Sequence, residues 1–274
     1  LAPPTTPTTP TAYPTAAQRL AVVRITAREP ECIEAAMPGS AACAGGQEVF
    51  GSGFFLRIPD FNAGSCGDAG RIVIITNAHV VGDSKDLMFE MPDLTGVAAY
   101  AVAAISVNVE WDIAVLDISD STKDDITSAL DAQADFPALE LALDSDQDLA
   151  GGSFSNVNEE VVSIGYPLAQ DTVVASFGSR SGGEIVFGNY VYEFDAQISP
   201  GSSGGCVVRK SDGKVIGISF ASVNSPEAES LNFAIPAFRV AIQLASVFCG
   251  EVASPTISTC DGGQALDCEF NVAD

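Results

Sequence analysis

Three residues that can act together on an acyl group occur in the order histidine, aspartate, serine. His79 is the only histidine and follows the apolar run RIVIIT. Asp112 stands directly before the apolar run IAVLD, and Ser203 lies in the run GSSGG. A serine hydroxyl is a weak nucleophile until a neighbouring base takes its proton, and an acid must orient that base. The three residue types therefore indicate a Ser-His-Asp arrangement for acyl transfer.

The GSSGG run at residues 201–205 has the composition of a tight turn between apolar strands. Because Gly201 has no side chain, its N–H can turn inward beside that of Ser203, as stabilisation of an oxyanion requires. Ser203 is the expected nucleophile because the paired glycines follow it. Taken alone, the run also fits a plain flexible loop, and only the upstream histidine and aspartate favour the catalytic interpretation.

The two partner residues also have simpler explanations. His79 could be a structural histidine at a strand end, where a short helical turn begins. Asp112 could cap a turn, although a carboxylate directly before a buried strand is costly unless it is bonded. Asp117, at the far end of the same strand, is the competing acid.

Composition limits the classes of partner. The chain has 274 residues, of which 47% are hydrophobic, so it can bury a substantial core. Its 12 basic and 36 acidic residues give a net charge of −24, which argues against nucleic acid and anionic membranes as partners. No apolar run approaches the roughly 18 residues of a membrane span. The negative charge fits solubility, or the attraction of cationic peptides.

The seven cysteines indicate disulfides rather than a metal site; they are Cys32, Cys43, Cys66, Cys206, Cys249, Cys260 and Cys268. The chain has no Cys-x-x-Cys pair and one histidine, so we expect no metal and no cofactor. Cys206 lies in an apolar strand and is the expected free, buried thiol. Local spacing favours the pairs Cys32–Cys43 and Cys260–Cys268, which leaves Cys66–Cys249. Such a pattern is typical of an oxidising compartment, so we expect a secreted or periplasmic protein.

Short apolar runs between glycines and prolines predict an all-β chain. The strands expected in the first half span residues 20–27, 48–58, 71–76, 85–91, 96–108 and 112–119. Those of the second half span 159–168, 171–179, 183–196, 204–210, 214–223 and 230–236. Apolar residues at helical spacing predict a C-terminal helix over 237–248, and the acidic segment 120–136 holds either a short surface helix or a loop.

Two runs of about six strands predict two six-stranded antiparallel β-barrels with a site between them, although periodicity alone does not exclude a sandwich. The expected organisation is a Pro/Thr-rich tail, a first barrel, a second barrel with the C-terminal helix, and a C-terminal tail. These parts span residues 1–18, 19–140, 141–250 and 251–274.

A set of collinear motifs carries a family resemblance. These motifs are GSGFF, TNAHVV, DIAVLDI, SIGYPLA, DAQISPGSSGG, GKVIGIS and LNFAIP. They occur in the order found in trypsin-like serine proteases, and they most resemble the HtrA/DegP branch of the chymotrypsin-fold family. The resemblance runs from about Leu20 to Phe248, and it implies a chymotrypsin-like fold and a serine endopeptidase.

The resemblance assigns a role to each residue of the site. Ser203 attacks the scissile carbonyl, His79 transfers its proton to the leaving amine, and Asp112 holds the imidazole. The backbone N–H groups of Gly201 and Ser203 form the oxyanion hole, with Ser202 between them.

The resemblance also places the substrate. The edge strand at residues 219–221 should pair with the substrate backbone. The walls of the specificity pocket are expected to include Gln197, Ile198, Ser199, Ser219, Phe220, Ala221, Asn232 and Ala234. Gln197 stands where an acid would select Arg or Lys, so we expect small or medium aliphatic side chains instead.

Three departures from the family pattern qualify the resemblance. Ser202 replaces the aspartate that trypsin-type zymogens pair with a new N-terminus, so activation by N-terminal insertion is not expected. Cys206 replaces a proline and places a thiol near the nucleophile, where it could confer redox sensitivity. Too few residues follow Phe248 for the PDZ domain of HtrA proteins, so we expect that domain to be absent from this chain or to lie in a part not present.

The expected function is therefore a serine endopeptidase that acts on polypeptides through an acyl-enzyme. The alternative is a non-catalytic or latent peptide-binding pseudoprotease or chaperone on the same fold. The sequence leaves the oligomeric state open between a monomer and an HtrA-like trimer.

Overall fold

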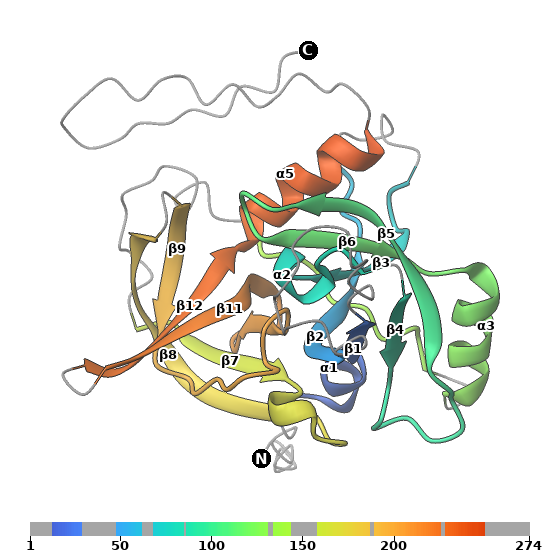
Figure 1. Ribbon diagram of the computed structural model, residues 1–274, viewed down its shortest axis with the longest axis horizontal. Helices are drawn as coiled ribbons and strands as arrows, with labels where there is room; N and C mark the ends of the chain where they lie inside the picture. Colours follow the sequence, from blue (N-terminus) through green and yellow to red (C-terminus); the bar gives the residue numbers. More distant parts are fainter. Residues whose placement is uncertain are drawn as a thin grey trace, which may run out of the picture.

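The chain forms two closed six-stranded antiparallel β-barrels and a C-terminal helix. The computed structural model describes residues 13–28, 48–61, 68–84, 86–130, 134–143, 158–186, 189–225 and 228–249. Figure 1 shows the first barrel, in blue to green, beside the second barrel, in yellow to orange. The predicted all-β, chymotrypsin-like architecture is confirmed.

The first barrel has the strand order β1-β2-β3-β6-β5-β4. Its strands are β1 (Val22–Arg28), β2 (Glu48–Arg57), β3 (Ile72–Thr76), β4 (Asp86–Glu90), β5 (Tyr100–Asn108) and β6 (Ile113–Asp117). Its helices are α1 (Ala16–Leu20) before β1, α2 (Ala78–Val81) after β3 and α3 (Asp120–Ala129) after β6. The acidic segment therefore contains a helix, which begins where the Ser119 hydroxyl accepts the N–H of Thr122 at 3.1 Å.

The second barrel has the strand order β10-β11-β12-β9-β8-β7. Its strands are β7 (Glu160–Gly165), β8 (Val174–Val186), β9 (Asn189–Phe194), β10 (Cys206–Arg209), β11 (Val215–Ser225) and β12 (Ala228–Pro236). A short 3-10 turn, η2 (Pro167–Ala169), follows β7, and helix α5 (Ala237–Phe248) follows β12. Figure 1 shows α5 lying along one edge of the molecule beside the strands of the first barrel.

One predicted strand is wrong. Residues 183–196 do not form a single strand, because β8 runs on to Val186 and β9 begins at Asn189. The two strands pair antiparallel with Val186 opposite Asn189. The sequence contains a hairpin signal there, Gly188-Asn189, but the continuous apolar and aromatic pattern on both sides of it outweighed that signal.

Strands β3 and β6 are buried on both faces, and they hold the first half of the site. Successive side chains of a strand point to opposite faces. Val73 and Ile75 therefore enter a core shared by both barrels and α5, whereas Ile74 enters the core inside the first barrel. This explains the unbroken apolar runs that precede His79 and follow Asp112.

The segment that connects the barrels forms backbone hydrogen bonds first with one barrel and then, at the next residue, with the other. Leu139 donates its N–H to the carbonyl of Phe55 on β2 at 2.9 Å, which belongs to the first barrel. Next in the chain, the carbonyl of Glu140 accepts the N–H of Val215 on β11 at 2.8 Å, which belongs to the second. This change occurs beside the boundary expected between residues 140 and 141, which stays a prediction.

Helix α5 ties the second barrel back to the first. Gln243 accepts a hydrogen bond from the side-chain amide of Asn108 at 3.1 Å and donates one to the hydroxyl of Ser106 on β5. Among the described residues, no helix is both long enough and apolar enough to cross a membrane.

Candidate active site

The structure brings His79 and Asp112 together at one end of the first barrel. Strands β3 and β6 are paired, with Thr76 opposite Ala114, so the residues just beyond their ends become neighbours. His79 Nδ1 lies 2.7 Å from Asp112 Oδ2, and the backbone N–H of His79 donates to Asp112 Oδ1 at 2.9 Å. Both carboxylate oxygens thus bind the same residue, which fixes the position of the imidazole ring.

The backbone of Asp112 is also held in place. Its φ is +54°, in the left-handed region that aspartate and asparagine enter more readily than other residues with side chains. The amide of Asn77 donates to the Asp112 carbonyl at 2.9 Å. The preceding residue, Trp111, donates its N–H to the side chain of Asn108 at 2.9 Å. This local turn aims the carboxylate at His79 while β6 continues into the core.

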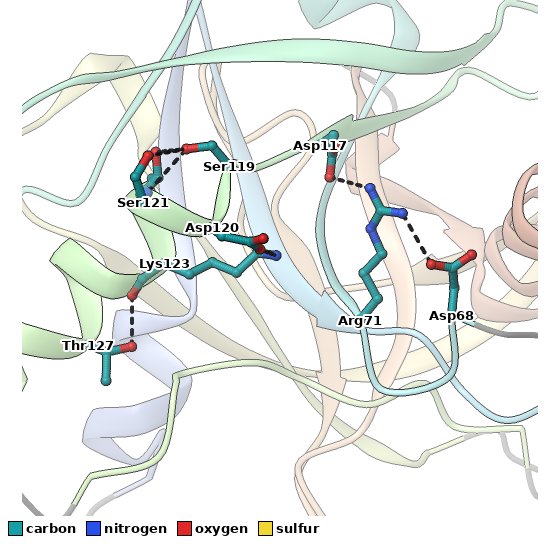
Figure 2. Close-up of polar contacts among 9 residues, drawn as sticks. Asp68, Arg71, Asp117, Ser119, Asp120, Ser121, Lys123 and Thr127 are labelled. Carbon is teal, nitrogen blue, oxygen red and sulfur yellow. Dashed lines mark hydrogen bonds and ion pairs between the residues drawn. The ribbon is translucent and has the colours of Figure 1, made fainter.

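Asp117, the competing acid, has other partners. Figure 2 shows the guanidinium of Arg71 between Asp117 and Asp68, at 2.8 and 3.2 Å. Asp117 is the last residue of β6, whereas Asp112 directly precedes the first residue of that strand. The structure therefore leaves Asp112 as the acid that contacts His79.

Ser203 lies in a tight turn that the sequence specifies closely; residues 199–203 are called the nucleophile turn below. The N–H of Ser202 donates to the carbonyl of Ser199 at 2.8 Å, which closes a four-residue turn. Pro200 is its second residue and Gly201, with a φ of +93°, its third. Proline followed by glycine at positive φ is the signature of a type II turn.

Two N–H groups of the nucleophile turn remain available to a ligand. Within the described residues, the N–H groups of Gly201 and Ser203 donate to no protein acceptor. The carbonyl of Pro200 accepts the N–H of Leu168 at 2.6 Å. Because the N–H of a trans peptide points opposite to its C=O, the N–H of Gly201 points away from Leu168.

The Ser203 hydroxyl is oriented away from a bond with the histidine. Its Oγ donates to the Phe220 carbonyl across a long 3.5 Å contact, and in the described part of the chain Ser203 and His79 share no hydrogen bond. Catalytic hydrogen bonds often tighten only when substrate binds.

Comparison with known proteins identifies the family. The trypsin-like peptidase domain matches residues 51–218, more than half of the chain, and this segment contains His79, Asp112 and Ser203. The chain belongs to the trypsin-like peptidase domain family.

Relatives of this peptidase domain carry HtrA names. The Bacillus subtilis serine protease Do-like HtrA is 34% identical over 179 residues, which cover 61% of this chain and 34% of the relative. The serine protease HtrA-like of Staphylococcus aureus strain USA300 is 28% identical over 183 residues, 62% of this chain and 21% of that protein. The chain thus spans about a third or less of the length of these relatives.

Solved structures share the fold. The active form of the Rv3671c protease from M. tuberculosis superposes with a TM-score of 0.58 at 21% identity, covering 85% of this chain and 82% of that one. The serine endoprotease from Yersinia pestis gives 0.54 at 21% identity, covering 83% and 62%. At this identity the likeness concerns the architecture alone.

The peptidase domain places the expected specificity residues on two adjacent segments. Strands β11 and β12 pair Ser219 with Ala234 and Ala221 with Phe233, separated by a bulge. The Ser219 hydroxyl is buried and lies 3.1 Å from that of Ser163. Gln197 and Ser199 are exposed, whereas Ile198 packs against the core of the second barrel.

Asn232 and Phe220 complete this region. The buried amide of Asn232 donates to the Ala196 carbonyl at 3.0 Å, which links β12 to the segment before the nucleophile turn. The half-buried ring of Phe220 lies 6.3 Å from that of Phe233. None of the residues predicted to line the specificity pocket carries a charged group. The side chain of Ala221 lies outside the described part of the structure.

Sequence reasoning missed a cavity of about 300 Å³ that lies beside Asp112. Its lining includes Trp111, Tyr190, Phe220 and Arg239, so only Phe220 is shared with the predicted pocket. Burial lowers the pKa of Arg239 below its ordinary value. The cavity combines elements far apart in sequence, and a lone tryptophan was the only available signal.

Cys206 is free and fully buried, as predicted. Burial raises the pKa of its thiol to about 12, so the thiolate that would react with oxidants is suppressed. Cys249 is disulfide-bonded. The other five cysteines lie outside the described residues, so the predicted pairings stay predictions.

Proposed function

We propose that this chain is a serine endopeptidase that uses His79, Asp112 and Ser203. The observation that carries the proposal is the double contact of the Asp112 carboxylate with the ring and the backbone N–H of His79. With Nδ1 engaged, the other ring nitrogen is left to accept a proton, as a general base requires. Serine endopeptidase activity also agrees with the names of the HtrA relatives.

The proposed reaction passes through an acyl-enzyme. Ser203 Oγ gives up its long contact with Phe220, loses its proton to His79 and attacks the scissile carbonyl carbon. The carbonyl oxygen then becomes an oxyanion, which the N–H groups of Gly201 and Ser203 bind. His79 returns the proton to the leaving amine, and water hydrolyses the ester by the same steps.

The proposed substrates are polypeptides bound as an added strand along residues 219–221. β11 is the strand that presents Phe220 beside the nucleophile turn, and its backbone there is interrupted by a bulge rather than paired continuously with β12. The Ile198 and Phe220 side chains favour a small or medium aliphatic residue before the scissile bond. Gln197 offers no charge to select Arg or Lys.

A non-catalytic peptide-binding role is the second candidate. One observation favours it, the orientation of the Ser203 hydroxyl toward the Phe220 carbonyl and not toward His79. In that case the strand surface at residues 219–221 would bind peptides without cleaving them.

A fluorophosphonate probe and a peptide library separate the two candidates. We expect one covalent adduct, which peptide mapping places on Ser203 and not Ser202, and cleavage after aliphatic residues. Ser203→Ala should lose the adduct and lower kcat by about 10⁴–10⁶-fold. Ser128→Ala, on the exposed face of α3, is the matched control. An unlabelled, correctly folded wild-type protein that still binds peptides would support the second candidate.

The proposal extends to the location of the protein. The cysteine pattern and the HtrA relatives support an extracytoplasmic location, secreted or periplasmic. Sedimentation of the full chain decides whether the protein is a monomer or a trimer.

A further inference from the structure

Ser52 on β2 is fully buried in the first barrel, yet most of its hydrogen-bonding groups reach the second. Its Oγ donates to the Gly201 carbonyl at 2.7 Å and accepts the N–H of Tyr166 at 2.8 Å. Its own N–H donates to the Ser203 carbonyl at 2.8 Å. Only its carbonyl bonds within the first barrel, where it accepts the Thr76 hydroxyl at 2.7 Å.

These bonds are part of a complete set along the nucleophile turn. Each of the four carbonyls of residues 200–203 accepts a hydrogen bond. The donors, in order, are the N–H of Leu168, the hydroxyl of Ser52, the N–H of Gly205 and the N–H of Ser52. The free N–H groups of Gly201 and Ser203 belong to the two peptides whose carbonyls Leu168 and Gly205 hold. Ser52 holds the two peptides that alternate with these, and by fixing both neighbours of the Ser202–Ser203 peptide it restrains the direction of the free N–H groups.

Two glycines pack closely against Ser52. A Cβ built on Gly204 would lie 2.1 Å from the Ser52 carbonyl, and one built on Gly165 would lie 3.0 Å from its Oγ. Two glycine backbones therefore pack directly against this serine. Removing the hydroxyl leaves the Gly201 carbonyl and the Tyr166 N–H without their partner.

We propose that Ser52 is a positioning residue that clamps the nucleophile turn from the opposite barrel and so holds the oxyanion-binding N–H groups in their working direction. It touches neither substrate nor His79, and it acts through the carbonyls of Gly201 and Ser203. The inference rests on the proposed function, because it concerns the same turn.

The test is Ser52→Ala, which keeps the backbone N–H and removes only the hydroxyl. We expect kcat for a peptide amide to fall about 10–100-fold with KM little changed, a smaller loss than removing an oxyanion-hole donor itself. The inhibition constant of a peptide boronic acid, whose serine adduct places an oxygen at the oxyanion position, should rise by a similar factor. A merely structural role would not separate kcat from KM in this way.

Thr122→Val is the matched control, because it also removes a buried hydroxyl but lies on α3, away from the site. Each protein is assayed well below its own melting temperature. The proposal fails if folded Ser52→Ala keeps wild-type kcat and boronate affinity, or if Thr122→Val loses as much kcat.

If Ser52→Ala does not fold, Ser52→Gly takes its place, since it also removes the hydroxyl and adds no atom to the packed surroundings. A lowered kcat supports the clamp, and a wild-type kcat overturns it. Failure of the proposed function looks different, because the wild-type protein would then neither cleave peptides nor react with the fluorophosphonate.

Discussion

The two halves of the site are held in different ways. The His79–Asp112 pair lies entirely within the first barrel, just beyond the ends of the paired strands β3 and β6, and each residue contacts the other directly. The nucleophile turn belongs to the second barrel, yet two of the donors to its carbonyls come from Ser52 of the first barrel. The acid–base half is thus self-contained, whereas the nucleophile half is completed across the barrel interface.

This difference has a consequence for damage to each half. A change at the pair should abolish proton transfer and leave the rest of the fold undisturbed. A change around the turn should redirect N–H groups, and the resulting loss of kcat should depend on how many of the four carbonyl contacts the change removes. Graded substitutions can therefore tell the two halves apart.

Among the substitutions that compare the two halves, the largest effect is expected for Asp112→Asn. The amide keeps the size of the side chain and tolerates the φ of +54°, but it can no longer accept both contacts from His79. We expect kcat to fall by about 10⁴-fold, as loss of the correct tautomer predicts. Steady-state kinetics measure the loss of kcat, and thermal unfolding shows whether the variant keeps the stability of the wild type.

Asp117→Asn is the control for that variant. It weakens the pair with Arg71, which is partly exposed, so it should cost no more than about 1 kcal/mol of stability. Its kcat should equal that of the wild type. An Asp112→Asn protein with wild-type kcat would remove Asp112 from the mechanism.

Gly201→Ala comes next, because it acts on the nucleophile turn itself. The new Cβ would lie 2.7 Å from the Tyr166 carbonyl and 2.9 Å from the Leu168 nitrogen, at a φ of +93°. The turn must move or flip, so we expect kcat to fall by about 100-fold or more, the loss typical of a missing oxyanion donor.

Gly96→Ala separates strain from contact. Gly96 has a similar φ of +87°, but no atom lies within 4 Å of the added Cβ. It should therefore cost about 1–2 kcal/mol in urea unfolding and leave kcat unchanged. Equal kcat losses in both glycine variants would mean that global destabilisation, rather than the turn, sets the effect.

A smaller effect is expected for Arg24→Ala, which acts one step further away. From β1 of the first barrel, Arg24 donates to the carbonyls of Ala169 and Gln170 at 3.1 and 3.3 Å, and so holds the segment that carries the Leu168 N–H. We expect kcat to fall about threefold to tenfold, less than the loss of a direct oxyanion donor. Arg28→Ala, on the same strand with an exposed partner in Glu48, should leave kcat unchanged. A larger loss in Arg28→Ala than in Arg24→Ala would break the link to Leu168.

Sequence reasoning located the residues whose chemistry is visible in their type. A lone histidine, an aspartate before a buried strand and a glycine-rich turn, together with the collinear family motifs, predicted His79, Asp112 and Ser203, and the structure brings the first two into contact. The alternation of side chains along β3 and β6 between two cores explains why both strands were recognisable as continuous apolar runs. The number and spacing of such runs favoured two closed barrels but did not by themselves exclude a sandwich.

Sequence could not show which backbone groups would need a partner. Ser52 was visible only as part of GSGFF, and its role depends on the carbonyls of a turn about 150 residues away. The cavity beside Asp112 is similar, since it needs Trp111, Tyr190 and Arg239 from three separate elements. Tertiary packing creates both features, and no local pattern encodes them.

The smallest effect on activity is expected for chemistry at Cys206, which is close in sequence to the nucleophile but enclosed in the shared core. Its thiol has an ordinary pKa of 9.0 that burial raises to about 12 in the folded protein. At pH 8, iodoacetamide should leave Cys206 unmodified and kcat unchanged, while the urea-unfolded chain is alkylated.

The raised pKa of Cys206 also makes stability depend on pH. Because the folded pKa is the higher one, the stabilising contribution of the thiol is full below pH 9 and is lost as the pH rises toward 12. Above pH 9 the free energy of unfolding should therefore fall by up to about 1.4 kcal/mol per pH unit for this group, a component that Cys206→Ala removes. Alkylation of the folded protein at the rate of the unfolded chain would show that the strand carrying Cys206 opens readily and that burial does not protect the thiol.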